Sequence, residues 1–197
     1  MTETITGETF SDEDWYGEDL ADRSYERCGF HDVDLTEATS QGAVFTECVF
    51  GNVKLNASRH TDSAFLRCTF TRTSLFEADF SGCKMVGSTF TDCSLRPLRI
   101  AGGDWSFVGL ARADLRGVRI SDARLREIDV TGANFGDATV TRCDLSGAHL
   151  DQARFTKCDL RGSDLSGFDP TRCDARGAII DGHQAIAIVM ALGLVLG

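Results

Sequence analysis

The sequence has little proline, no long hydrophobic run and no basic stretch at its start. Two prolines stand among 197 residues, and the longest apolar run, residues 185–196, is too short to span a bilayer. The opening residues lack the basic and apolar regions of a secretory signal, so we expect a cytoplasmic protein that is not bound to a membrane. Acidic residues outnumber basic ones by 30 to 20, and the net charge of −10 argues against direct binding to DNA or to anionic lipid.

Motifs for catalysis and metal binding are also missing. The chain has no C-x2-C pair, no H-E-x-x-H helix, no nucleophile elbow, no P-loop and no dinucleotide fingerprint. Its four histidines, His31, His60, His149 and His183, are far apart in the sequence. We therefore expect no metal and no cofactor. A metal or redox protein remains a third hypothesis, and it predicts bound zinc or reactive thiols among the eight cysteines.

What the sequence has instead is a period of five residues. A large apolar residue stands at every multiple of five from 5 to 180, and the only exceptions are Ser40, His60, Pro170 and Ala175. The residue two positions earlier is mostly small, and all eight cysteines occupy that phase. The residue two positions later is rich in glycine. The phase never slips, so no insertion interrupts the array.

This period fits neither an α-helix nor a flat strand, but it fits a chain that turns a corner after every five residues. The small and the large residue lie two apart and point inward, as in a strand, and glycine or a short polar residue follows at the corner. Four sides close a square coil, so residues 20 apart should stack. We predict three columns: an aromatic ladder (Phe10, Phe30, Phe50, Phe70, Phe90), a leucine ladder (Leu35, Leu55, Leu75, Leu95, Leu115) and a thiol column (Cys28, Cys48, Cys68).

The pattern resembles the pentapeptide-repeat family, whose motif is A(D/N)LXX. Close matches are residues 113–117 (ADLRG), 163–167 (SDLSG) and 78–82 (ADFSG), and cysteine replaces alanine in 143–147 (CDLSG). The resemblance covers about residues 5–180 and implies an all-β fold, a right-handed quadrilateral β-helix. Such a solenoid is filled by its own side chains and offers no large concave pocket, so we expect no enzymatic activity. Within the family, the length, the central phenylalanines, residues 93–98 (CSLRPL) and the apolar tail are similar to the mycobacterial fluoroquinolone-resistance branch.

The tail predicts a short α-helix that follows the coil. Asp181 and Gln184 form a capping-box pattern in front of an apolar stretch, which divides the chain into a β-helix over 1–180 and a capping and dimerisation helix over 181–197. The helix is apolar on every side, so one side can cover the end of the coil and another must also be buried. A second copy of the chain is the favoured cover, and a helix folded flat over its own coil is the alternative. The candidate dimerisation residues are Ile186, Ile188, Val189, Met190, Leu192, Leu194, Val195 and Leu196.

Charge is unevenly distributed along the chain. Residues 1–40 carry twelve acids and two bases, residues 96–126 carry seven arginines and three acids, and residues 127–181 carry ten acids and six bases. The rod is therefore expected to be acidic at its start, basic at its waist (residues 96–126) and acidic again near the proposed dimer centre. Five residues a side give a width of roughly 16 Å before side chains are added, which is about the calibre of a DNA duplex.

Two readings of the second acidic region are open. Regularly placed carboxylates on a rod of duplex size favour mimicry of DNA, and the candidates are Glu127, Asp129, Asp137, Asp144, Asp159, Asp164, Asp169 and Asp174. The alternative is structural, because an Asp before the central residue can hydrogen-bond its own turn. The family resemblance favours mimicry and implies a protein that binds DNA gyrase, inhibits supercoiling and protects the enzyme from fluoroquinolones.

A few residues depart from the pattern. His60 falls on the large inward phase and stacks above Ser40, and we expect a tolerated polar defect in which the two side chains touch or share a water. Phe76 and Phe107 fall on outward phases and are possible exposed anchors, although a distortion near residues 96–103 would tuck Phe107 inside. These aromatics and the basic waist support the alternative function, a non-enzymatic scaffold that binds another protein.

Overall fold

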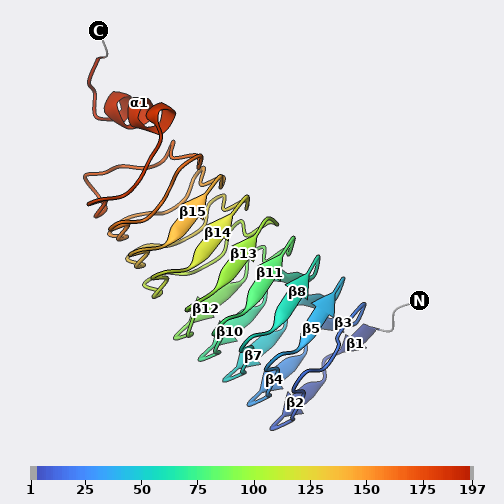
Figure 1. Cartoon of the computed structure of the whole chain (residues 1–197). Helices are drawn as coiled ribbons and strands as arrows, with labels where there is room; N and C mark the ends of the chain where they lie inside the picture. Colours follow the sequence, from blue (N-terminus) through green and yellow to red (C-terminus); the bar gives the residue numbers. More distant parts are fainter. Residues whose placement is uncertain (1–3, 196–197) are drawn as a thin grey trace.

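The computed structural model describes residues 4–195 as a straight rod of stacked coils with one helix at its C-terminal end (Figure 1). All strands are three residues long. Their bounds are β1 (Thr4–Thr6), β2 (Thr9–Ser11), β3 (Ser24–Glu26), β4 (Gly29–His31), β5 (Thr39–Gln41), β6 (Val44–Thr46), β7 (Val49–Gly51), β8 (Arg59–Thr61), β9 (Ala64–Leu66), β10 (Thr69–Thr71), β11 (Asp79–Ser81), β12 (Thr89–Thr91), β13 (Arg99–Ala101), β14 (Arg119–Ser121) and β15 (Thr139–Thr141). The helix α1 spans Gly182–Ala191.

The strands form three parallel sheets, one on each of three sides of the coil. Their orders are β1-β3-β6-β9, β12-β10-β7-β4-β2 and β15-β14-β13-β11-β8-β5. Single bridging pairs, such as Asp34 with Lys54, hold the fourth side. The register pairs residues 20 apart, for example Phe10 with Phe30 and Tyr25 with Phe45. The fold is the right-handed quadrilateral β-helix that the sequence predicts.

The predicted aromatic ladder runs through the first half of the rod. Phe10, Phe30, Phe50, Phe70 and Phe90 stack with ring centroids 5.1, 4.9, 4.6 and 4.5 Å apart. These separations match the spacing of neighbouring parallel strands, because each ring stands on the strand directly above or below its partner. Parallel displaced rings at this distance add attraction to the area that they bury. The prediction of stacked columns is confirmed.

The second half of the rod has a mainly aliphatic core. Leu115, Leu125, Val130 and Leu145 are all buried on the phase that phenylalanine dominates earlier in the chain. One short aromatic stack returns near the end, where the rings of Phe135 and Phe155 lie 5.1 Å apart. The same backbone therefore accepts aromatic or aliphatic residues, provided that each column is filled.

His60 is a buried polar residue inside this core, as predicted. Its Nδ1 atom lies 2.7 Å from the Ser40 hydroxyl and its Nε2 atom lies 3.1 Å from the Ser58 hydroxyl. The Ser40 hydroxyl also contacts that of Ser63 at 2.9 Å. The imidazole ring stacks on Phe80 with a centroid separation of 4.7 Å. Both ring nitrogens are satisfied without a charged partner, which suits a neutral imidazole.

The corners are left-handed turns. The residue two positions after the central residue has a positive φ at most corners, whether it is glycine, as at Gly17 (φ 66°), or not, as at Asp12 (φ 56°). The exceptions are Pro97, Gly167 and Arg172. Glycine is needed more strictly at Gly103, where φ is 84° and an added Cβ would stand 2.0 Å from the Cys83 carbonyl oxygen. Glycine is common at the corners because this conformation costs it little.

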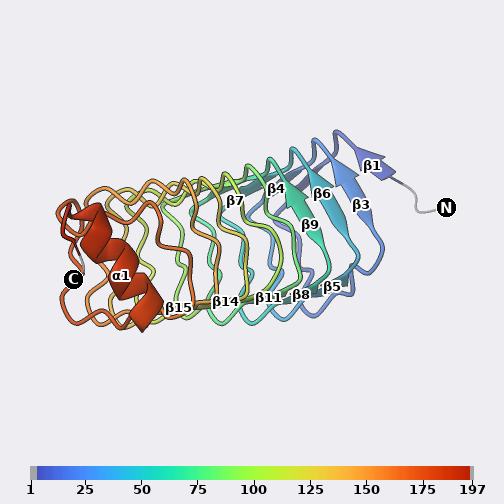
Figure 2. The same cartoon turned by 90° about the horizontal axis from the view of Figure 1, so that it is seen from above.

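Helix α1 lies across the last coil (Figure 2). The capping box is present: Gln184 N–H donates to the Asp181 carboxylate at 3.0 Å, and Asp181 N–H donates to the Gln184 side-chain oxygen at 2.8 Å. The buried Gln184 amide also donates to the carbonyl oxygens of Leu160 and Ser163, at 2.6 and 2.7 Å. These bonds tie the helix to the coil end. Across residues 4–195, no helix has the length and apolar character needed to cross a membrane.

Candidate interaction surfaces

Six of the eight candidate acids have a structural task. Each accepts a hydrogen bond from the backbone N–H two residues later, at 2.8–3.2 Å, and closes its own corner. They are Asp129, Asp144, Asp159, Asp164, Asp169 and Asp174. The structural reading of these carboxylates is therefore confirmed at the level of contacts. It does not exclude a second role, because a carboxylate has several acceptor sites.

Three of these six acids also form ion pairs with arginine. Arg126 contacts Asp144 at 2.5 Å, while Arg161 and Arg176 contact Asp159 and Asp174 at 2.7 Å each. Hydrogen bonding from the Arg176 side chain lowers the pKa of Asp174 to about 2. These pairs neutralise charge locally, so the three acids are weak candidates for attracting a cationic partner.

Glu127 and Asp137 differ from the other six. They occupy the left-handed corner position, with φ of 51° and 56°, and their side chains are exposed. Over residues 4–195 neither side chain has a hydrogen bond or an ion pair. Their charges are the most available of the eight.

The candidate acids do not gather on one face. Asp144 and Asp164 form a backbone β-bridge on the side of the coil that holds β1. Asp129 lies on the side that holds β2, and Asp159 lies on the side that holds β5. Asp174 lies on the side that only bridging pairs hold, where it pairs with Arg154. The carboxylates therefore surround the rod, which suits a diffuse negative potential better than one localised contact.

Most arginines of the basic waist form ion pairs. Five of its seven arginines contact carboxylates at 2.5–3.6 Å, and these are Arg96, Arg99, Arg116, Arg124 and Arg126. In the described part of the chain, Arg112 and Arg119 have no such partner. The exposed positive charge of the waist is thus smaller than the residue count indicates.

The repeat, the square coil and the left-handed corners agree with a known sequence family. The model of pentapeptide repeats matches eight copies here, over residues 61–95, 129–167 and 153–184. The chain belongs to the pentapeptide-repeat family. Among curated protein sequences, none matches it significantly.

Solved structures of other pentapeptide-repeat proteins have the same fold. A trypsin-treated form of QnrB1, a plasmid-mediated fluoroquinolone resistance protein, is 22% identical over 100% of this chain and 98% of its own, with a TM-score of 0.90. Full-length QnrB1 is 20% identical over 98% of this chain and 100% of its own, with a TM-score of 0.69. HetL, involved in heterocyst differentiation regulation in the cyanobacterium Nostoc sp. strain PCC 7120, is 16% identical over 88% of this chain and 86% of its own, with a TM-score of 0.57. At these identities the likeness establishes the fold.

Both candidate anchors of this pentapeptide-repeat protein, Phe76 and Phe107, are exposed aromatic side chains, as is Tyr16. Phe76 is 48% exposed and follows a buried central leucine, as its phase predicts. Phe107 is 55% exposed and occupies a left-handed corner with φ 60°. The sequence left its position open, and the structure places it outside. A bulky residue with a positive φ is uncommon.

The candidate dimerisation residues divide between the two faces of the C-terminal segment. Ile188 and Val189 are half-buried, and Ile188 packs against the core. Leu196 lies outside the described residues. The others form an exposed apolar surface, which we call the tail surface: Ile186, Met190, Leu192, Leu194 and Val195. Several exposed large apolar side chains within one short segment are of the kind that a partner often covers.

The cysteines behave as small interior residues. All eight are free thiols, six are buried, and Cys93 and Cys173 are half-buried. Burial raises the pKa of the Cys158 thiol to about 12. Among residues 4–195, no group of three or more potential metal ligands comes together. The signal for this role was present in the sequence, because every cysteine occupies the small inward phase.

Proposed function

We propose that this protein binds DNA gyrase as a duplex-like rod, inhibits supercoiling and protects the enzyme from fluoroquinolones. The observation that carries the proposal is the match to QnrB1, a fluoroquinolone resistance protein, over the full length of this chain with a TM-score of 0.90. The sequence resemblance to the mycobacterial resistance protein MfpA supports the same function and names gyrase as the partner. Such a protein acts in the cytoplasm, by binding and without catalysis.

The physical basis of the proposal is shape combined with charge. The rod has roughly the calibre of a duplex, and carboxylates surround its C-terminal half on all four sides. A basic channel built for phosphates would attract this surface over distances of about 10 Å at ordinary salt concentrations. Glu127 and Asp137 contribute most, because among residues 4–195 their carboxylates form neither an ion pair nor a hydrogen bond to their own turn.

Dimerisation through the tail surface is part of the proposal. Two rods joined at their C-termini would double the length of the duplex-like body and bury the apolar residues that α1 exposes. We expect Met190→Glu with Leu194→Glu to convert the dimer to a folded monomer, because a two-fold axis brings the introduced charges of both copies together. Sedimentation velocity measures this change directly, and a wild-type protein that sediments as a monomer would refute the dimer.

Binding to purified gyrase at increasing salt tests the central interaction. We expect affinity to fall steeply with ionic strength, and we expect the double variant Glu127→Gln, Asp137→Asn to bind at least about tenfold more weakly. The matched control is Asp12→Asn, Asp22→Asn, which removes the same charge from exposed left-handed corners near the N-terminus. Equal losses in the two double variants would attribute binding to net charge, and no loss in either would contradict mimicry.

A second candidate function rests on the exposed aromatics. Phe76 and Phe107 are accessible anchors of the kind that dominate protein interfaces, and they suit a scaffold that binds a partner through its waist. Salt distinguishes the two functions, because an apolar contact is insensitive to ionic strength and fails on Phe76→Ala. Binding to gyrase that survives high salt and is lost in Phe76→Ala would favour the scaffold.

A further inference from the structure

Main-chain hydrogen bonds join successive coils throughout most of the rod. One set of these bonds lies at the corner before the side that only bridging pairs hold. There, the residue two positions after the central residue donates its backbone N–H to a carbonyl of the next coil. Arg72 N–H donates to the Thr91 carbonyl at 3.0 Å, and Arg112 N–H donates to the Thr131 carbonyl at 2.8 Å. Where this pattern holds, a coil has no free backbone edge, because its N–H and C=O groups are paired with those of the neighbouring coils.

The pattern is interrupted between residues 92–95 and residues 111–114. Within the part of the chain that the structure describes, three bonds expected from the repeat are missing there: Asp92 N–H to Ala111, Asp114 N–H to Cys93 and Leu95 N–H to Asp114. Bonds directly below and above this interval are intact. A second set of bonds is missing near the end of the described rod, where Leu145, Gly147 and Leu150 N–H lack the bonds expected to Asp164, Ser166 and Asp169. At residues 92–95 and 111–114, two short backbone edges therefore face each other across an opening in the side of the rod.

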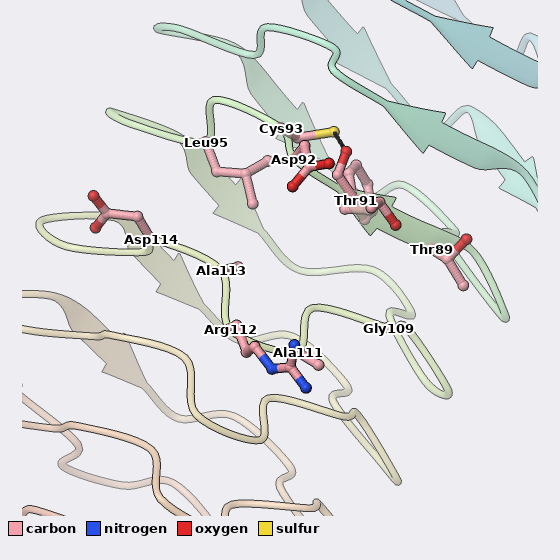
Figure 3. A pocket seen from close by; sticks show the side chains of 11 residues that line it. Thr89, Thr91, Asp92, Cys93, Leu95, Gly109, Ala111, Arg112, Ala113 and Asp114 are labelled. Atoms are coloured by element: carbon pink, nitrogen blue, oxygen red, sulfur yellow. Dashed lines mark hydrogen bonds between the residues drawn. The ribbon is translucent and has the colours of Figure 1, made fainter.

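The opening is a cleft of about 540 Å³ between the two segments (Figure 3). Thr89, Thr91 and Leu95 lie on one wall, and Ala111 and Arg112 lie on the other. A second hollow of about 460 Å³ adjoins it, since both are lined by Cys93, Leu95 and Asp114, and the exposed Phe76 lines this second hollow. The two hollows form one groove, which we call the waist groove.

Two charged side chains that line the waist groove, Arg112 and Asp92, lack an ion pair among residues 4–195, and their charges are of opposite sign. Arg112 is exposed and has no ion pair among residues 4–195. Asp114 is already held by Arg96 at 3.1 Å and by Arg116 at 2.7 Å. A ligand in the groove thus meets the Arg112 guanidinium on one wall and the Asp92 carboxylate on the other, beside free backbone donors and acceptors.

We propose that the waist groove binds an extended peptide segment of another protein by strand addition, with an acidic side chain of the peptide on Arg112. Free N–H and C=O groups on facing chain segments offer the main-chain pairing that an added strand uses, and side-chain hollows supply selectivity. A nucleic acid fits poorly, because the protein is strongly acidic and, among residues 4–195, Arg112 is the only arginine without an ion pair that lines the groove. This groove is separate from the acids of the C-terminal half and from the tail surface, so its test needs no gyrase.

The test uses ¹⁵N-labelled full-length protein and blocked octapeptides of alternating valine and threonine that carry two glutamates. We expect shifts confined to residues 89–95 and 109–114. In free protein the amide protons of Asp92 and Leu95 should exchange quickly, and the peptide should slow them. The amides of Arg72 and Arg112 serve as internal references, because both are hydrogen-bonded already. A peptide that is N-methylated on alternate amides should not bind.

Charge variants of Arg112 test its contact with the glutamate of the peptide. Arg112→Glu should weaken binding of the glutamate peptide by about tenfold or more and favour a lysine version. The matched control is Arg72→Glu, at the same corner beside an intact ladder, where the change should stay under about twofold.

Three results would overturn the proposal. In the first, no peptide of the panel binds at millimolar concentration while Asp92 and Leu95 exchange as slowly as Arg72. In the second, Arg112→Glu leaves the preference for glutamate over lysine unchanged. In the third, inorganic phosphate alone reproduces the shifts, which would identify an anion site instead of a strand site.

Discussion

Acidification should destabilise the protein through His60. The imidazole is 2% exposed, and it contacts the hydroxyls of Ser40 and Ser58 and the rings of Phe65 and Phe80. No carboxylate forms an ion pair with it across residues 4–195. Burial lowers the pKa of His60 to about 3. The folded protein therefore keeps the ring neutral at pH values where the unfolded chain protonates it.

The sign and size of the effect follow from proton linkage. The group's contribution is complete above the unfolded pKa of about 6.5 and is lost as the pH falls from there towards the folded pKa of about 3. Between pH 7 and pH 5 the unfolded state gains most of one proton, which corresponds to about 2 kcal/mol of lost stability. Hydrogen-bonded carboxylates such as Asp174 have lowered pKa values, and their contribution to stability is lost below this window.

Urea unfolding at pH 7 and pH 5 measures the effect, with His60→Phe as the comparison. Phenylalanine keeps the ring stack, and the hydroxyls of Ser58 and Ser63 retain their bonds to the Leu55 and Thr61 carbonyl oxygens. We expect the variant to lose about 2 kcal/mol less than wild type on acidification. The difference between the two proteins removes contributions from the other histidines. If both proteins lose stability equally, the reasoning about the buried imidazole is wrong.

Two further predictions concern packing. Phe50→Ala should cost about 3–5 kcal/mol because it removes a ring stacked on both sides, whereas Phe10→Ala, at the half-buried end of the ladder, should cost less. Urea unfolding compares them, and equal costs would contradict the role of the ladder. Gly103→Ala should lower the melting temperature far more than Gly117→Ala, because the new Cβ of the first meets the Cys83 carbonyl at 2.0 Å and that of the second meets nothing within 4 Å. The second variant pays only for its positive φ, about 1–2 kcal/mol, and equal melting temperatures would show that the Gly103 backbone relaxes.

The repeat was predictable because its signal is redundant. Each coil needs four large inward residues at fixed positions. Successive coils place the same residue at the equivalent position, as Phe30, Phe50 and Phe70 do. A single exception, such as His60, does not obscure it. The contact between His60 and Ser40 also followed from the period, since a difference of 20 places two residues in one column.

The surface could not be predicted equally well. Charge totals along the chain describe a basic waist, but ion pairs form between coils, as between Arg126 and Asp144 or Arg124 and Asp104, 18 and 20 residues apart. Those pairings depend on side-chain conformations that the repeat does not determine. The waist groove was equally hidden, because residues 92–95 and 111–114 keep the five-residue phase while their backbone bonds are absent. Phase alone therefore predicts burial better than it predicts hydrogen bonding.

A supercoiling assay with cognate gyrase tests the proposed function most directly. Relaxed plasmid is incubated with active enzyme and increasing amounts of this protein, with and without a fluoroquinolone. We expect supercoiling to be inhibited and drug-induced double-strand breaks to become fewer as the protein is added. Unchanged supercoiling and unchanged breaks at tens of micromolar protein would contradict binding to gyrase.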